Sequence, residues 1–85
     1  GYSDILLEPT PQNAARLPVI AIEVKRAHDT AGKDITDQAA LNAHASNVAL
    51  KQAIDKHYGA GLHGNGISRW GVSFSGKMVG VAKEG

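Results

Sequence analysis

The segment 19–25 limits the folds open to this chain more than any other part of the sequence. It follows Pro18 and reads Val-Ile-Ala-Ile-Glu-Val-Lys, a nearly continuous run of β-branched and other apolar residues. Such a run is typical of a strand that is covered on both faces of a sheet. Glu23 and Lys25 interrupt the run at its far end. Because the preceding residues are so apolar, the sequence favours a functional role for these two charges over a solvated surface.

Four further segments complete the predicted secondary structure. Segment 3–8 is apolar at its centre and is followed by two prolines, which predicts a short strand. Segment 36–58 is rich in Ala, Leu, Gln, Lys and Asn and lacks Gly and Pro, which predicts a long helix. Segment 67–74 alternates large apolar with small or polar residues, as a strand does. The sequence 75–77, Ser-Gly-Lys, suits a tight hairpin turn into a return strand at 78–82.

The predicted order is therefore strand, strand, long helix, strand, strand. A strand–helix–strand crossover of this length joins two parallel strands, and a hairpin at each end adds antiparallel neighbours. We therefore expect an α/β (α+β) fold, in which a mixed sheet of about four strands carries one long helix. The 85 residues are enough for one domain, which spans 1–85.

The helix has a predicted beginning, a predicted face and one weak point. Thr36 or Asp37 is a suitable N-cap. Apolar spacing places Val48 on the face toward the sheet, and Gln52, one turn later, shares that face. Asn and Ser residues around Ser46 are mediocre helix formers, so a break there is compatible with the sequence.

Composition narrows the functional classes only in part. The chain has no cysteine, which removes disulfide scaffolds and thiolate metal sites and fits a cytoplasmic protein. No apolar run approaches the roughly 20 residues that span a bilayer, so we expect no membrane partner. A net charge of +1 neither supports nor excludes nucleic acid as a partner, since a local cluster of basic residues is sufficient.

The expected pairing of the first two strands brings three charged residues together. If the first two strands pair as a hairpin with Glu8 opposite Val19, paired residue numbers add up to 27, and Asp4 then lies opposite Glu23. Cβ atoms of directly opposite residues lie roughly 5 Å apart. Lys25, two residues after Glu23, projects to the same face.

Two facing carboxylates repel each other and need a compensating charge. A divalent cation provides it, because Mg²⁺ (or Mn²⁺) binds one or two carboxylates and completes its shell with water and phosphate oxygens. Lys25 beside the cation is suited to orient water or to stabilise charge on a phosphate. Plainer interpretations stay open: a solvated strand-end carboxylate for Asp4, a surface ion pair for Glu23 and Lys25, and an ordinary polar helix residue for Gln52.

An ordered set of motifs runs along essentially the whole chain: Asp4, the apolar segment 5–7, the segment 20–25 with Glu-x-Lys at its end, Gln52, Lys56 and Tyr58 in the helical region, and the segment 70–74. This set resembles the PD-(D/E)xK nuclease superfamily, the restriction-endonuclease-like proteins. It is similar to one subgroup often found C-terminal to an AAA-like ATPase region in bacterial proteins.

The resemblance implies specific roles for five residues. Asp4 and Glu23 correspond to metal ligands, and the backbone carbonyl of Val24 completes the metal shell. Lys25 corresponds to the catalytic lysine. Gln52 corresponds to a helix glutamine near the site.

The resemblance also implies a truncated restriction-endonuclease-like core in 1–85, without the family's first helix and first strand. Ser3 stands where the proline of the family motif is expected. The expected function is that of a metal-dependent nuclease, a Mg²⁺-dependent phosphodiesterase whose partner is nucleic acid, DNA in the first place. The alternative is a catalytically inactive module of the same fold that binds nucleic acid or protein. A homodimer formed through the exposed first strand is a further alternative.

Other residues receive plainer interpretations. The four histidines lack the spacing of a metal motif, so no histidine site is expected. Trp70 and Phe74 are interpreted as core residues rather than as platforms for nucleic-acid bases. Arg26, Lys33 and Lys56 are within reach of phosphates in principle, but solvated surface is the preferred interpretation.

Overall fold

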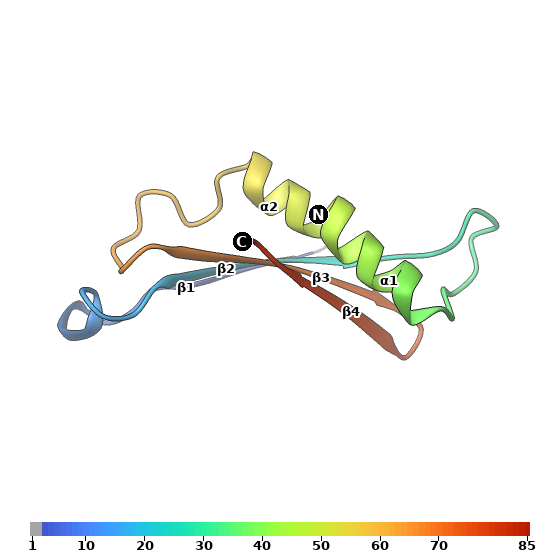
Figure 1. The fold of residues 1–85 in the computed structure, drawn as a ribbon, viewed down its shortest axis with the longest axis horizontal. Helices are drawn as coiled ribbons and strands as arrows, with labels where there is room; N and C mark the ends of the chain where they lie inside the picture. The colour runs from blue at the N-terminus through green and yellow to red at the C-terminus, as the bar shows by residue number, and fades with distance from the viewer. Residues whose placement is uncertain (1–2) are drawn as a thin grey trace.

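One sheet and one helical stretch build the structure, a computed structural model that describes residues 3–85 (Figure 1). The strands are β1 (Ser3–Leu7), β2 (Val19–Arg26), β3 (Ile67–Ser75) and β4 (Met78–Lys83). The helical elements are the 3₁₀ turn η1 (Pro11–Asn13), and α1 (Gln38–His44), η2 (Ala45–Leu50) and α2 (Lys51–Asp55), which follow one another without interruption. The chain is therefore a mixed α+β structure of two layers, as predicted.

The sheet has the strand order β1-β2-β3-β4. The hairpins β1–β2 and β3–β4 are antiparallel, and the crossover through the helix makes β2 and β3 parallel. Two residues connect β3 to β4, and Gly76 takes φ 57° there, a left-handed conformation that glycine adopts readily. Strand β1 is an edge strand, because β2 is its neighbour on one side and the sheet order ends with it.

The register of the first hairpin agrees with the prediction. Asp4 is the partner of Glu23, and Leu7 is the partner of Ile20, so paired numbers add up to 27. On the other side of β2, Glu23 is the partner of Gly71 in β3. Asp4, Glu23 and Gly71 therefore form one row across the sheet, on the face that the helix covers.

The helical stretch begins as predicted but has an unexpected middle. Asp37 is the N-cap, and its Oδ2 accepts a hydrogen bond of 3.1 Å from the Ala40 amide. The region of the predicted break is the π-helical segment η2, which continues the helix with a wider turn. Val48 is 36% exposed, so its prediction as a sheet-facing residue was wrong, because the wider turn moves the buried face to Ala49 and Leu50.

Two glycines let the helix lie close to the sheet. A Cβ atom on Gly71 would overlap the Ala45 carbonyl oxygen and the Leu50 amide nitrogen of η2. A Cβ atom on Gly80 in β4 would similarly overlap the backbone of Leu41 in α1. The helix backbone therefore rests directly on β3 and β4, and its C-terminal part α2 lies near the row that contains Glu23.

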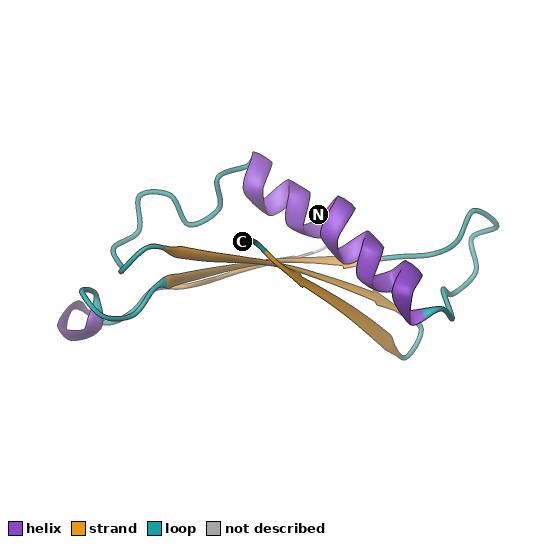
Figure 2. Cartoon of the chain, in the orientation of Figure 1, coloured by secondary structure: helices purple, strands orange, loops and turns teal. Residues whose placement is uncertain are grey.

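The helix covers one face of the sheet, and the described chain leaves the other face open (Figure 2). Small residues dominate the buried core between helix and sheet, whose apolar members are Val19, Ala21, Ala27, Leu41, Ala45, Ala49, Leu50 and Ala53. The larger apolar side chains lie on the open face and are half-buried or exposed: Ile5, Leu7, Ile20, Ile22, Val24, Trp70, Val72, Phe74, Val79 and Val81.

Two predictions about burial were therefore wrong. Strand β2 is covered on one face only, and Trp70 and Phe74 are not core residues, because both lie on the open face and are half-buried. The alternation itself was predicted correctly, since Gly71 and Ser73 between them are buried under the helix. Among residues 3–85, none of the helices has the length and apolar character needed to cross a membrane.

Candidate active site

Glu23 is the centre of the candidate site. Its side chain has no exposed surface, and it lies directly opposite Asp4 of the neighbouring strand. Neither Oε1 nor Oε2 of Glu23 accepts a hydrogen bond from any residue in the described range. Burying a carboxylate without hydrogen-bond donors costs free energy, so positive charge nearby has to stabilise it.

Two lysines approach this carboxylate from different layers. The Nζ atoms of Lys25 in β2 and of Lys56, which directly follows α2, each lie 3.9 Å from Oε1 of Glu23. At this distance each lysine forms an ion pair with Glu23 but no direct hydrogen bond. The Lys25 side chain is 16% exposed, whereas that of Lys56 is 47% exposed. One amine is therefore enclosed beside the carboxylate, and the other stands where solvent reaches it.

Tyr58 connects Asp4 to Lys56. Its hydroxyl group donates a hydrogen bond of 2.8 Å to Oδ2 of Asp4 and accepts one of 3.2 Å from Nζ of Lys56. The same lysine lies over the tyrosine ring, with Nζ 5.5 Å from the ring centroid. Hydrogen bonding to Tyr58 raises the pKa of Lys56 above its usual value, so the amine is charged at neutral pH.

The end of the helix explains how Tyr58 reaches this position. His57 has φ 53°, and its amide donates to the Ile54 carbonyl, while the Tyr58 amide donates to the Ala53 carbonyl. This pair of bonds is a Schellman motif, in which the residue after the C-cap is left-handed. The chain reverses there, and the Tyr58 carbonyl is held by the Nε of Arg69 in β3 at 2.9 Å.

The two carboxyl groups have opposite pKa shifts. Burial, followed by the neighbouring Asp4 carboxyl group and its charge, raises the pKa of Glu23 above its usual value. Interaction with Glu23, and then the hydrogen bond from Tyr58, lowers the pKa of Asp4. The buried acid is therefore the one that ionises less readily, and Asp4 is the one that ionises more readily.

The residues fit a hard divalent cation. Three buried oxygen atoms, Oε1 and Oε2 of Glu23 and Oε1 of Gln52, accept no hydrogen bond within the described chain. Oxygen atoms of this kind, together with the Asp4 carboxylate, are the ligands that Mg²⁺ prefers. Nowhere in residues 3–85 do three or more His, Cys, Asp or Glu side chains cluster as a metal site built from side chains alone would require. Two carboxylates suit Mg²⁺, which keeps several water ligands.

Gln52 and Val24 are placed less directly. Gln52 precedes Lys56 by one helical turn, and their backbones are joined by the bond from the Lys56 amide to the Gln52 carbonyl. Gln52 is thus on the helix side that faces the site, while its role there stays a prediction. Val24 lies on β2 between Glu23 and Lys25, with its side chain on the open face of the sheet. A ligand role for its backbone carbonyl also stays a prediction.

One histidine, His44, has a buried hydrogen-bond partner. His44 bonds through Nδ1 to the buried hydroxyl of Ser73 at 2.7 Å. Burial, and then the charges of Lys25 and His28, lowers the pKa of His44, so it is neutral at pH 7. His44 therefore packs beside Lys25 as an uncharged neighbour.

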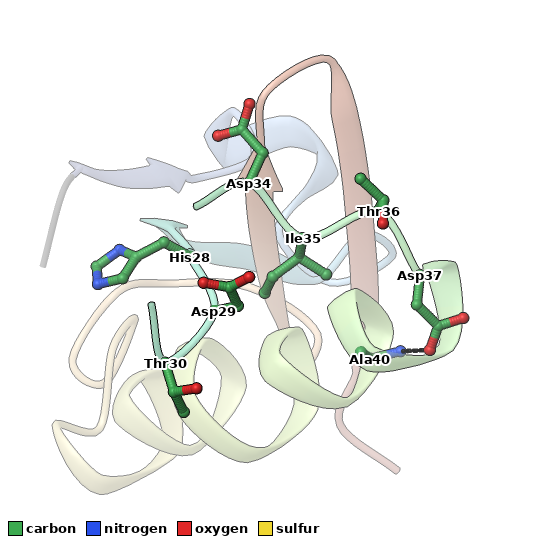
Figure 3. A pocket seen from close by; sticks show the side chains of 8 residues that line it. All are labelled: His28, Asp29, Thr30, Asp34, Ile35, Thr36, Asp37 and Ala40. Carbon is green, nitrogen blue, oxygen red and sulfur yellow. Dashed lines mark hydrogen bonds between the residues drawn. The ribbon is translucent and has the colours of Figure 1, made fainter. Parts of the chain in front are cut away.

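A depression of about 440 Å³ lies away from this site, along the loop between β2 and α1. Asp29, Asp34 and Asp37 are among the residues that line it, and their carboxylates are spread apart around it (Figure 3). Asp29 accepts hydrogen bonds from the amides of residues 31 and 33, and Asp37 caps the helix. Asp29 and Asp37 therefore accept hydrogen bonds from backbone amides, in contrast to Glu23.

The structure brings together most of the predicted site and adds to it. Asp4, Glu23 and Lys25 share one region of one face, as the register argument required. Lys56 had been interpreted as solvated surface, yet it lies beside Glu23, and the contact of Tyr58 with Asp4 was not predicted. Lys56 and Tyr58 belonged to the motif set that carries the sequence resemblance, which assigned them no contacts.

Comparisons with known proteins do not extend this description: no family model, curated protein or solved structure matches the chain.

Proposed function

We propose that this chain carries the catalytic centre of a Mg²⁺-dependent phosphodiesterase that hydrolyses nucleic acid, with DNA as the first candidate substrate. The observation that supports the proposal most strongly is the buried Glu23 carboxylate, which faces Asp4 and has no hydrogen-bond donor on either oxygen. Two lysine amines at 3.9 Å add positive charge beside it. Paired carboxylates next to lysines are a combination suited to phosphodiester hydrolysis.

Asp4 and Glu23 would hold the cation between β1 and β2. A Mg²⁺ ion bound there would polarise a phosphoryl oxygen and lower the pKa of a bound water molecule. The residues themselves supply rigidity, because Glu23 is enclosed under the helix and Asp4 is held by the Tyr58 hydroxyl. Rigid positioning of this kind contributes to catalysis because the groups need little rearrangement during the reaction.

Lys25 is the best candidate for stabilising charge on the reacting phosphate. Its amine lies beside Glu23, is mostly enclosed, and projects from a central strand. An enclosed ammonium group interacts more strongly with a developing negative charge than an exposed one. This location supports Lys25 as the catalytic lysine of the proposed enzyme.

The test is cleavage of plasmid DNA, single-stranded DNA and RNA with Mg²⁺ or Mn²⁺, comparing the wild type with Lys25→Ala. We expect the substitution to lower the cleavage rate by about 10²- to 10³-fold, the usual cost of removing one charge-stabilising donor. Lys77→Ala, which removes an exposed lysine in the β3–β4 turn, is the control and should leave the rate unchanged.

Each alternative outcome has a definite meaning. Equal rates for Lys25→Ala and the wild type would exclude the lysine from the mechanism. Absence of cleavage with both metals, on all three substrates, would contradict the enzymatic proposal. Nucleic-acid binding that persists without any cleavage would support the alternative of an inactive binding module.

A further inference from the structure

Lys56 differs from the other lysine of the same helical region in its surroundings. Lys51 forms an ion pair of 2.6 Å with Asp55 one turn later and is 67% exposed. Lys56 instead points toward strands β1 and β2, where its Nζ lies 3.9 Å from Glu23 and 3.2 Å from the Tyr58 hydroxyl. The first lysine stabilises its own helix, and the second belongs to the candidate site.

The Lys56 ammonium group retains hydrogen-bonding capacity. It carries three N–H donors, and one of them is used in the bond to Tyr58. The contact with Glu23 is too long for a direct hydrogen bond. Because nearly half of the side chain is exposed, a solute can reach the remaining donors.

A chain of contacts fixes the location of this amine. Arg69 holds the Tyr58 carbonyl and is itself paired with Glu84 at 3.2 Å, so β3 anchors the turn after the helix. The Tyr58 hydroxyl then contacts both Lys56 and Asp4. One side chain thereby links the position of an amine to that of a carboxylate on the edge strand.

We propose that Lys56 binds a phosphate group of the nucleic-acid substrate. We also propose that Tyr58 is the positioning residue that fixes the Lys56 amine relative to the Asp4 carboxylate. This inference rests on the proposed function, because it assigns Lys56 to the same substrate. Lys25 and Lys56 flank Glu23 as an enclosed and an exposed amine. The exposed amine thus contacts a phosphate as the substrate enters, while the enclosed one acts at the reacting group.

The test measures binding of a fluorescent oligonucleotide over a range of KCl concentrations. It is done with EDTA, and again with Mg²⁺ in a Lys25→Ala background in which hydrolysis is slow. Each phosphate contact contributes about 0.7 to 0.9 to the slope of log K against log salt. We expect Lys56→Ala to reduce the slope by about that amount and to weaken binding about five- to tenfold at 0.1 M salt.

Lys51→Ala is the matched control, because it removes the same charge from the same helical region. It should change the slope by much less than Lys56→Ala does. Lys56→Arg keeps the charge and should recover most of the affinity. An equal effect of Lys51→Ala and Lys56→Ala, or no oligonucleotide binding by the wild type, would overturn the assignment.

Tyr58→Phe tests the positioning role separately. It keeps the ring but removes the hydroxyl that contacts both Lys56 and Asp4. We expect weaker oligonucleotide binding and, by calorimetry, an affinity for Mg²⁺ reduced about 10-fold or more, as found when outer hydrogen bonds to ligands are lost. Unchanged Mg²⁺ affinity in a variant that melts like the wild type would exclude this role.

These measurements separate the inference from the proposed function. A chain that binds the oligonucleotide with the predicted slope change but never cleaves it would support the phosphate contact and contradict the enzyme. A chain that cleaves, with binding insensitive to Lys56→Ala, would support the enzyme and contradict the phosphate contact.

Discussion

Glu23 is the residue at which stability and the proposed function conflict. Its carboxylate is buried, faces another acid and has no hydrogen-bond donor among the described residues. Without a cation, the protein therefore gains from protonating this group, and burial raises its pKa accordingly. The proposed function explains why Glu23 is present despite this cost, because a cation site would require its negative charge.

We expect Glu23→Gln to be more stable than the wild type in the absence of divalent cations, by about 1–3 kcal/mol at neutral pH. The introduced amide carries no charge and can donate to Asp4. Since the folded-state pKa of Glu23 is raised, the unfolded chain ionises first as the pH rises above the ordinary value of 4.5. Wild-type stability then falls with rising pH until the folded-state pKa is passed, so the difference between the two proteins should grow over that window.

Urea denaturation between pH 4 and pH 8 measures this difference. The lowered pKa of Asp4 acts in the opposite sense and at lower pH, since its stabilising contribution is lost as the pH falls below about 3.8. Mg²⁺ should raise the stability of the wild type and not of the variant. Asp34→Asn, which removes the same charge from an exposed carboxylate, is the control and should leave the response of stability to Mg²⁺ unchanged. A variant less stable than the wild type at pH 8 would contradict this account.

At the residue scale, the sequence was sufficient for the part of the site that lies on strands. Strand pleating places every second residue on one face, and the hairpin register follows from a single pairing, so Asp4, Glu23 and Lys25 could be predicted together. Lys56 and Tyr58 could not be assigned contacts in this way. The sequence predicted a helix that runs to residue 58, whereas α2 ends at Asp55 and His57 is left-handed, so the chain reversal that brings Tyr58 to Asp4 was not predicted.

At the scale of elements, strands were predicted almost to the residue, and the helix was predicted in extent but not in geometry. Apolar alternation and turn residues are local signals, which is why β3 and the following turn were recognised. The π-helical segment η2 has no comparable signature in composition. It lies where the helix backbone meets Gly71, and this contact depends on tertiary packing. The faces of the helix after residue 45 could therefore not be derived from a regular period.

Gly71 is the element-scale position where a small change should have a large effect. Gly71→Ala adds one methyl group against the backbone of η2, and the helix must move away from the sheet to accommodate it. We expect a loss of about 2–3 kcal/mol of stability, in the range of overpacked cores. The shift would also move α2 away from Glu23, so Mg²⁺ affinity should fall.

Thermal and urea unfolding, with calorimetry for Mg²⁺, measure both effects. Gly32→Ala is a useful comparison, because it changes a loop glycine with φ 80° and nothing within 4 Å. It should cost only the conformational penalty of about 1 kcal/mol. Equal destabilisation by the two substitutions would show that the close approach at Gly71 is unimportant.

At the scale of the whole molecule, most large apolar side chains lie on the face of the sheet that the helix does not cover. The helix covers a face of alanines and other small residues, and the opposite face carries isoleucine, valine, tryptophan and phenylalanine without a covering element in the described chain (Figure 2). The apolar character of segment 19–25 was therefore recognised from the sequence, but which of its faces the helix covers was not. The composition of a strand indicates how apolar its two faces are, but it does not indicate which face another element of the chain covers.

Val81→Lys tests whether the open face is in contact with solvent. The residue is exposed on the edge strand β4, so the substitution should change stability by no more than about 0.5 kcal/mol. The isolated chain should also bind a hydrophobic dye such as ANS, and the substitution should reduce the dye signal. Ala49→Lys, on the buried side of the helix, is the contrasting variant and should unfold the chain. Strong destabilisation by Val81→Lys would mean that this face is covered.

The margin of the sheet holds one of the two acids of the candidate site. Strand β1 is bonded to a neighbour on one side alone, so its five residues can fray while β2, β3 and the helix stay together. Each fraying event would move Asp4 away from Glu23, so that only one of the two acids of the candidate site would remain in place. If the proposed cation binds both acids, its binding and the pairing of β1 with β2 are coupled, so that cation binding would favour the paired strand.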